Sequence, residues 1–396
     1  MLGVGETVLS TSREVDLSSD EVCSVVSAGV AEKVPCKSTG LPRWGTSNGP
    51  LLLGYILLLI VRLYLASQSP INSTDLLRYL GFGKEFWTYG LDIYNHSPAD
   101  FGDAPYAQLW PHLRFIYPAM AMLFFAGTAA VYPCLFFARL VLTFIELGNA
   151  LLVSRMSGDK WLGLAFFANP ASIWWTSREG QYEALVAFFS LLALLSLRRT
   201  SPWSYWWLGL GIQAKYWPGV LLPYFASRER RPKVLGYFVA SFVPSVAFTL
   251  GGSYVFRILT SEAMAMNCNP YFWNFADGSR TCGTPLWHLC LNAIATYGIL
   301  AVLLAGAVLE WRRRKKPWAY VGPLAFMAYY KSVSWATPWY LPMCFVFALP
   351  IERRWVRWAV LVLGSLEPIA WAGLLGHPIG WLNPTPPAAY IFGRVG

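Results

Sequence analysis

A succession of apolar segments limits what this chain can fold into. The first covers residues 51–67, LLLGYILLLIVRLYLAS, and holds a single charged residue. A helix needs about 20 mainly apolar residues to cross a bilayer, and this segment comes close to that length. Ten further apolar segments lie at residues 114–131, 135–154, 161–176, 182–197, 203–226, 234–251, 288–309, 318–332, 336–350 and 355–375. The pattern predicts an all-α polytopic membrane protein of about 10–12 transmembrane or half-length helices.

The composition agrees with burial in lipid. Only 13% of the 396 residues are charged and 56% are hydrophobic, and the mean hydropathy is +0.42. Soluble proteins carry about a quarter charged residues, so the charge deficit is expected where lipid covers most of the surface. The 20 Trp and 21 Tyr residues also fit, because their rings favour the membrane interface.

The formal net charge of +10 comes largely from short basic clusters between apolar segments, at Arg228–Lys233, Arg312–Lys316 and Arg353–Arg357. This pattern is typical of cytoplasmic loops, whereas nucleic-acid binding needs a basic face on a soluble domain. We therefore expect no nucleic-acid partner. With these clusters in the cytoplasm, the polar segment from Gln68 to about Leu113 becomes a long first extracytoplasmic loop.

One region allows two topologies. Arg155 and Lys160 should also lie in the cytoplasm, which requires one net crossing where the sequence has two apolar segments. Either residues 114–131 form a re-entrant piece, or these two charges face the other side.

The ends of the chain and the cysteines are less informative. Residues 1–48 are polar and rich in Ser and Val, so we expect a disordered tail or an upstream start-site extension, with one transmembrane domain over residues 49–396. No apolar signal-peptide core precedes Leu51. The seven cysteines lack zinc-site spacing, and Cys268 and Cys282 are equally compatible with a disulfide or with free thiols.

Asp75 is the first candidate for chemistry, because it follows the first apolar segment directly. A carboxylate in this position could take a proton from an attacking hydroxyl, or hold a metal ion that activates it. The alternative is structural: Ser73 or Thr74 caps a helix, and Asp75 complements the helix dipole.

Three other elements place polar side chains among apolar segments, where they are costly and functional suspects. The segment NPASIWWTSREGQYEAL holds Arg178, Glu179, Gln181 and Glu183, although helix capping also explains them. The segment GLGIQAKYWPGVLLPY puts Lys215 before the helix-breaking Pro218, at the tip of a predicted hairpin of two half-length helices. The segment YYKSVSWATPWYLP contains Lys331 and Trp335.

In this order the elements resemble the GT-C superfamily of polyprenyl-phosphate-sugar glycosyltransferases, particularly its mannosyltransferase branches. Those families carry, in sequence, an Asp, a G-x-x-x-Y element, a Tyr-Pro pair, an Asn-Pro pair, a Gly-Gln/Asn-x-Asp/Glu element and a Lys-x-x-Pro element. The matching residues are Asp75, Gly90–Tyr94, Tyr117-Pro118, Asn169-Pro170, Gly180–Glu183 and Lys215–Pro218. The resemblance covers residues 50–225, with a looser match at 329–342.

The resemblance implies a GT-C-like bundle with Asp75 as the catalytic carboxylate and Lys215 near the donor phosphate. Further candidates are Lys331 and Arg62 for the phosphate, and Arg178, Glu179, Gln181, Glu183, Tyr117 and Trp335 for the substrates. Several branches carry a D-x-D pair where this chain has Ser73-Thr74-Asp75, so we predict neither a metal ion nor another cofactor.

The implied activity is transfer of a sugar, mannose by family frequency, from a polyprenyl- or dolichyl-phosphate donor to a glycan, a glycolipid or another acceptor. Its partners would be that donor, the acceptor and membrane lipids, on the extracytoplasmic or lumenal face of the plasma membrane or the endoplasmic reticulum membrane. Two other classes stay open: a transporter or flippase of lipid-linked substrates, and a non-catalytic membrane subunit. The lack of an internal repeat argues against the transporter, and the presence of Asp75 argues against the silent subunit.

Overall fold

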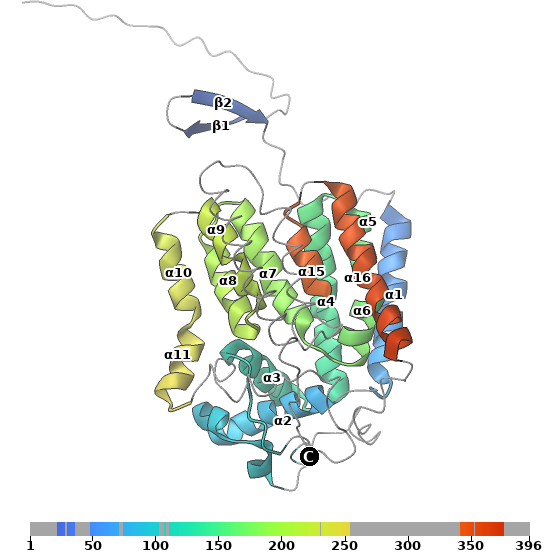
Figure 1. Ribbon diagram of the computed structural model, residues 1–396, viewed down its shortest axis with the longest axis vertical. Helices are drawn as coiled ribbons and strands as arrows, with labels where there is room; N and C mark the ends of the chain where they lie inside the picture. Colours follow the sequence, from blue (N-terminus) through green and yellow to red (C-terminus); the bar gives the residue numbers. More distant parts are fainter. Residues whose placement is uncertain are drawn as a thin grey trace, which may run out of the picture. The chain divides into compact units, whose positions relative to one another are not determined.

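The computed structural model describes residues 22–27, 30–35, 48–70, 74–102, 107, 111–229, 231–253, 341–351 and 353–375. The chain divides into two units, Met1–Gly45 and Thr46–Gly396, and the second of these is helical (Figure 1). The segments expected at 288–309 and 318–332 lie outside the described residues, as do Cys268 and Cys282.

The first unit contains a β-hairpin. Strands β1 (Val22–Ser27) and β2 (Val30–Pro35) pair antiparallel, with Val22 opposite Pro35 and Ser27 opposite Val30. The sequence led us to expect a disordered tail over residues 1–48. The valines of both strands give the local reason for extended structure, because β-branched side chains favour it.

Among the described residues of the second unit, two helices are long and apolar enough to cross a membrane, α1 (Gly49–Ser67) and α4 (Leu135–Ser157). Helix α1 buries its charged residue and exposes apolar ones. Its one arginine is buried, and its exposed large hydrophobic side chains are Leu52, Leu53, Ile56, Leu57, Ile60, Val61 and Tyr64. A continuous apolar outer face of this kind is stable only against lipid or another apolar surface. The chain is a membrane protein.

Other apolar segments are broken into shorter helices. Helix α5 (Lys160–Phe167) is followed by the short α6 (Pro170–Ser172), a π-helical turn over Ile173–Arg178 and α7 (Glu183–Arg198), with a bend of 118° between the segment 170–178 and α7. Helices α10 (Lys233–Ser241) and α11 (Val243–Leu250) meet at 47°. Pro170 lies at the break between α5 and α6, and Pro244 lies at the break between α10 and α11. Proline lacks the N–H that would continue the helix.

The predicted hairpin around Lys215 is present. Helix α8 (Trp203–Ala214) ends at Lys215, and a 3₁₀ turn (Trp217–Leu221) leads into α9 (Leu222–Arg228). Tyr205, near the start of α8, donates a hydrogen bond to the carbonyl of Glu229 and packs on Phe225. The two short helices therefore lie side by side, as Figure 1 shows.

The polar segment 68–113 is not a simple loop. It contains α2 (Thr74–Tyr89) and 3₁₀ turns at Gly90–Asn95 and Pro98–Phe101, and it leads to α3 (Ala119–Val131). Helix α2 crosses α3 closely at Gly83, where an added Cβ would lie 2.4 Å from the Phe125 carbonyl group. The sequence analysis raised this helix only in the structural alternative for Asp75, because polar residues are interspersed among its buried positions Leu76, Leu77, Leu80 and Phe82.

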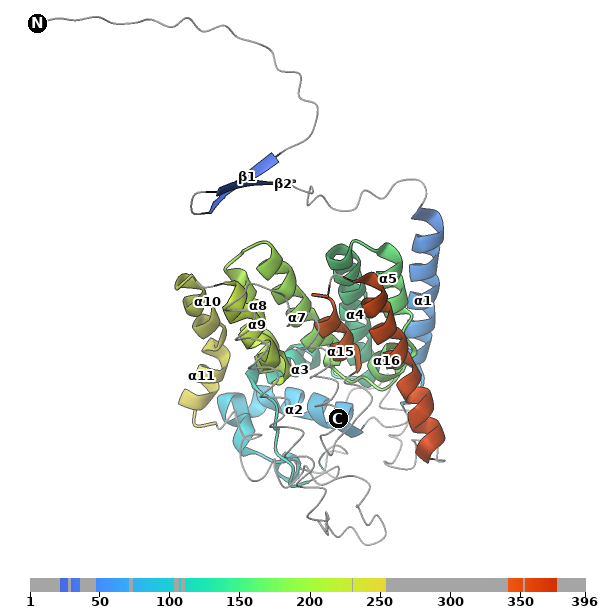
Figure 2. The ribbon, with the colours of Figure 1, turned by 45° about the horizontal axis from the view of Figure 1, so that its top comes forward.

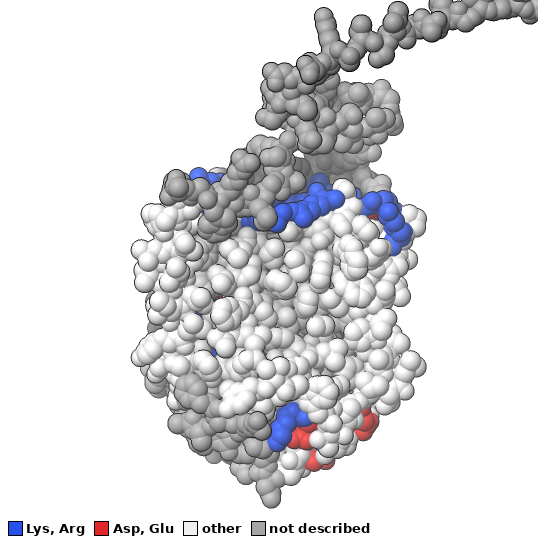
Figure 3. Space-filling model, turned by 180° about the vertical axis from the view of Figure 1, so that it is seen from behind, with Lys and Arg blue, Asp and Glu red and all other residues white. Residues whose placement is uncertain are grey.

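Charged residues gather at opposite ends of the helical unit (Figure 3). At the basic end, Lys160 contacts Asn48, Arg198 contacts the carbonyl of Met156, and Arg354 pairs with Asp159. At the opposite end, where basic and acidic side chains lie together, Arg139 near the start of α4 donates to the Gln68 carbonyl, and Asn95 donates to the Gly252 carbonyl. A broad uncharged belt separates the two ends in Figure 3.

This arrangement favours one of the two topologies left open by the sequence, the one in which residues 114–131 form a re-entrant piece. Arg155 in the last turn of α4 and Lys160 lie at the basic end, together with the clusters around Arg231 and Arg354. Helix α3 has 13 residues, which at about 1.5 Å per residue is too short to cross a bilayer. Of these two helices, only α4 is long enough to cross a bilayer.

The last described helices, α15 (Leu341–Ala348) and α16 (Arg354–Leu375), close the bundle. Helix α15 packs on α7, and α16 packs on α15 and α6, between the N-terminal α1 and the centre of the bundle (Figure 2). Phe166 of α5 contacts Phe345 of α15. The core therefore joins segments from both ends of the sequence.

Candidate active site

Asp75 lies in the first turn of α2, at the edge of the bundle core. One carboxylate oxygen accepts a hydrogen bond from Nη2 of Arg78 at 3.3 Å, and the side chain remains 33% exposed. Within the described part of the chain, its second oxygen accepts no hydrogen bond. The carboxylate lies close enough to that of Glu183 for the two charges to repel each other.

Arg78, one turn further along α2, is a site residue that the sequence analysis missed. It is only 4% exposed, and its Nε and Nη1 are buried without a hydrogen-bond partner among the described residues. Buried polar groups are almost always hydrogen-bonded, so these donors are suited to an incoming water molecule or ligand. The available signal was its position three residues after Asp75, where helix side chains meet.

Lys215 and Glu183 form a buried ion pair between two helix ends. Glu183 begins α7, Lys215 follows the last residue of α8, and their side chains are 1% and 4% exposed. The ammonium group lies 5.0 Å from the ring centre of Tyr117 and 4.9 Å from that of Tyr182, within the range of cation–π attraction. The second oxygen of Glu183 is buried and has no hydrogen-bond partner among the described residues.

Three tyrosines join the two halves of the site. Tyr79 donates to the hydroxyl oxygen of Tyr117 at 3.2 Å, and the rings of Tyr79, Tyr117 and Tyr182 pack edge to face with centroids 5.3–5.7 Å apart. We refer to Asp75, Arg78, Glu183 and Lys215 with these three tyrosines as the central cluster. It unites the segments around Asp75, Tyr117, Glu183 and Lys215 that the sequence singled out separately.

Gly180 is the pivot that brings two of these segments together. Its φ of +75° is unfavourable for other residues, and an added Cβ would lie 2.2 Å from Leu76, the neighbour of Asp75. The preceding π-helical turn ends with a hydrogen bond from the Glu179 N–H to the Trp174 carbonyl. Such turns are rare and often lie at functional sites, and this one allows the chain to turn sharply into Glu183.

The comparison with protein families identifies the class of protein. The family model of Glycosyltransferase family 87 matches residues 110–321, which is more than half of the chain. The chain belongs to glycosyltransferase family 87. It is therefore a membrane glycosyltransferase, as the resemblance implied. The match includes Tyr117, Glu183 and Lys215, while Asp75 and Arg78 precede it. The chain matches no curated protein and no solved structure.

Arg62 is not part of the central cluster of this family 87 glycosyltransferase. It is fully buried, and its five N–H groups are directed at the Phe167 and Ser172 carbonyls and at the Ser172 and Ser177 hydroxyls. Ser172 in turn donates to Glu146, which accepts a second bond from Asn149. The guanidinium thus has no donor left for a phosphate, and it holds the segment before the π-helical turn.

The polar residues before α7 occupy different environments. Glu179 and Gln181 are buried, and the Gln181 N–H donates to the Trp175 carbonyl. Arg178 keeps 23% of its side chain exposed and stacks over Trp174 at 4.4 Å. Glu183, from the same segment, is the member of the central cluster that pairs with Lys215.

Two of the predicted site residues are not described by the structure. Lys331 and Trp335 lie outside the described residues. Among the described residues, no three His, Cys, Asp or Glu side chains gather as metal ligands would. Two pockets lie at the basic end, near Arg354 and away from the central cluster.

Proposed function

We propose that this family 87 glycosyltransferase moves a sugar, most simply mannose, from a polyprenyl- or dolichyl-phosphate to a lipid-linked or glycan acceptor. Transfer takes place at the central cluster, toward the end opposite the basic clusters. By the positive-inside rule that end faces the extracytoplasmic or lumenal side.

The proposal rests on one observation. Buried Arg78 donors without a hydrogen-bond partner among the described residues lie beside the Asp75 carboxylate, next to the tyrosines of the central cluster. Nε and Nη1 of Arg78 are buried without partners among the described residues, and Asp75 lies one turn away. Guanidinium N–H groups form strong charge-assisted hydrogen bonds to phosphate oxygens, so Arg78 would bind the donor phosphate through these two donors. The Lys215 ammonium, paired with Glu183, lies 5.0 Å from the ring centre of Tyr117.

Asp75 acts as the general base. Its oxygen not bound to Arg78 accepts the proton of the acceptor hydroxyl, which attacks the anomeric carbon of the sugar. The bond between that carbon and the phosphate oxygen breaks, and the lipid phosphate leaves with the electron pair. Arg78 stabilises the charge that develops on this phosphate, so the leaving group needs no proton. The configuration at the anomeric carbon inverts, because the attack and the departure occur on opposite faces.

The test is transfer of label from radiolabelled polyprenyl-phosphate-mannose to membrane lipid extract, with the full chain reconstituted in liposomes. We expect a labelled product with the wild type and loss of at least about 100-fold in rate with Asp75→Asn, which removes the base but keeps the shape. Asp92→Asn, a carboxylate in the exposed 3₁₀ turn, is the matched control and should keep wild-type activity.

The outcomes separate the parts of the proposal. Full activity of Asp75→Asn would remove Asp75 as the base. Transfer from other lipid-phosphate sugars only would replace mannose and keep the mechanism. No transfer from any lipid-phosphate sugar by a folded protein would contradict the donor class.

A further inference from the structure

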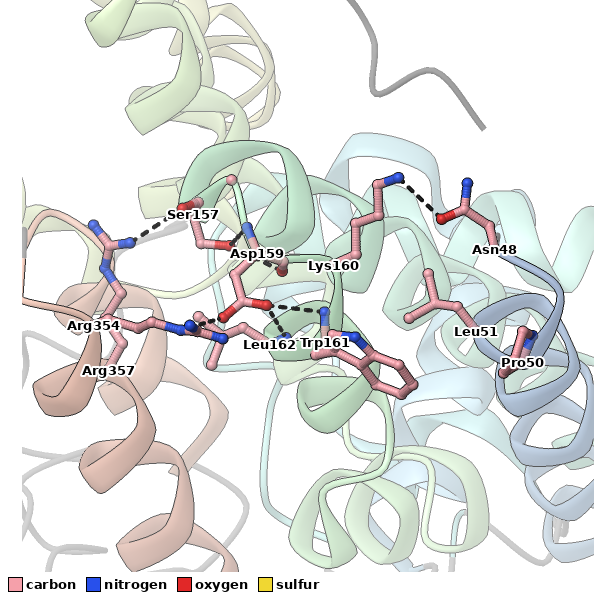
Figure 4. A pocket seen from close by; sticks show the side chains of 11 residues that line it. Asn48, Pro50, Leu51, Ser157, Asp159, Lys160, Trp161, Leu162, Arg354 and Arg357 are labelled. Atoms are coloured by element: carbon pink, nitrogen blue, oxygen red, sulfur yellow. Dashed lines mark hydrogen bonds and ion pairs between the residues drawn. The ribbon is translucent and has the colours of Figure 1, made fainter. Parts of the chain in front are cut away.

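A pocket at the basic end lies outside the central cluster (Figure 4). It has a volume of about 500 Å³ and lies between the start of α1, the loop from α4 to α5 and the start of α16. Its lining residues are Asn48, Pro50, Leu51, Ser157, Gly158, Asp159, Lys160, Trp161, Leu162, Arg354 and Arg357. Three elements far apart in the sequence thus build one concave surface.

The polar side of the pocket is positively charged. It carries Lys160, Arg354 and Arg357 against the single carboxylate of Asp159. Arg354 pairs with that carboxylate through Nε at 2.8 Å, yet its side chain is 71% exposed. Arg357 is held by the Ile351 carbonyl and directs Nη1 toward the Ser157 carbonyl. An anion entering the pocket would meet an excess of two positive charges.

The other side of the pocket is apolar and leads to the lipid-facing surface. Pro50, Leu51 and Leu162 line it, and the outer apolar face of α1 begins at Leu52. Trp161 at its rim is 56% exposed, and indole rings settle at the level of lipid headgroups. A second pocket, of about 720 Å³, shares Arg354 and adds Trp355, which is 66% exposed.

We propose that this pocket binds the phosphate headgroup of an anionic phospholipid from the adjacent leaflet. The charge excess selects an anion, and the apolar wall beside it accommodates the first carbons of the acyl chains. A soluble anion would use the charges but not this wall. Basic pockets between helices at a membrane surface bind anionic lipids in the same way.

Native mass spectrometry of the full chain in neutral detergent tests the proposal, with phosphatidylglycerol as the probe and phosphatidylcholine as the zwitterionic comparison. We expect preferential phosphatidylglycerol binding. The double variant Lys160→Gln/Arg354→Gln should weaken it about 25-fold, at about fivefold for each charge removed near a membrane surface. The control Arg199→Gln/Lys233→Gln removes the same charge from exposed sites that do not line the pocket and should bind as the wild type does.

A gain-of-binding variant makes the test independent of protein damage. Asp159 accepts the N–H groups of Trp161 and Leu162 at the start of α5, and an asparagine can keep this cap. Asp159→Asn removes the competing negative charge, so phosphatidylglycerol should bind more tightly. Equal binding of both lipids, or equal loss in the control variant, would overturn the proposal. Displacement of the lipid by millimolar inorganic phosphate would assign the pocket to a soluble anion.

Discussion

Lys215 and Glu183 pair with each other across the ends of two helices, and both side chains are almost fully buried beside Tyr117 and Tyr182. Neither helix supplies the pair by itself, because Glu183 is the first residue of α7 and Lys215 directly follows the last residue of α8. The pair therefore fixes how these two helices meet beneath Asp75.

Breaking this pair from one side should destabilise the protein strongly, because a buried charge would be left without compensation. We expect Glu183→Gln or Lys215→Met to cost about 3–5 kcal/mol each, and the double variant to cost less than their sum. Thermal unfolding in detergent, followed by tryptophan fluorescence, measures all four proteins. Strict additivity would show that the two charges do not interact.

Arg78 should affect donor binding in particular. Losing a charged hydrogen bond costs about 1.5–3 kcal/mol, so Arg78→Met should raise the donor KM about 10- to 100-fold. Arg78→Lys should recover part of this loss, since it restores the positive charge but not the planar guanidinium group. Lys84→Met, on the same helix but outside the central cluster, serves as the control in the transfer assay. An unchanged donor KM in Arg78→Met would place the phosphate elsewhere.

Gly180 should tolerate no side chain. Gly180→Ala forces a positive φ on alanine and drives its Cβ into Leu76, which together should cost about 2–4 kcal/mol. Replacing the neighbour as well, in Gly180→Ala/Leu76→Ala, should relieve the clash but not the backbone strain. The unfolding midpoint should therefore recover only in part. Gly127→Ala, at a helical position with open space around the added Cβ, should leave the unfolding midpoint unchanged or slightly raised.

Arg62 should behave as a structural residue. Arg62→Met leaves the buried Phe167 and Ser172 carbonyls without their guanidinium donor, so the thermal midpoint should fall substantially. The donor KM of the protein that remains folded should not change. A raised KM with a normal midpoint would instead return Arg62 to the phosphate site.

The turn at Pro98–Phe101 should open in acid. The Ser97 N–H holds the pKa of Asp100 below its ordinary value of 3.8, so the folded turn binds fewer protons than the unfolded one. Its stabilisation is therefore present above pH 3.8 and is lost as the pH falls through the lower, folded-state pKa. The difference in thermal midpoint between the wild type and Asp100→Ala should shrink accordingly. A constant difference at all pH values would exclude this linkage.

The sequence by itself determined the membrane class and most helical segments, because apolar length and charge placement report directly on lipid burial. It also pointed to Asp75, Glu183 and Lys215, since charges between apolar segments are costly wherever they lie. The family match confirms the glycosyltransferase class, while the roles of these residues stay predictions.

Only the tertiary structure decided which of these charges meet. Arg62 and Arg78 are each the one arginine of their helix. The first has every donor engaged by neighbouring segments, and the second keeps two buried donors beside Asp75. The close approach at Gly180 and the short α3 likewise depend on packing between distant segments. A local pattern specifies how a helix divides its polar and apolar faces, but the partner of each buried charge is set by the fold.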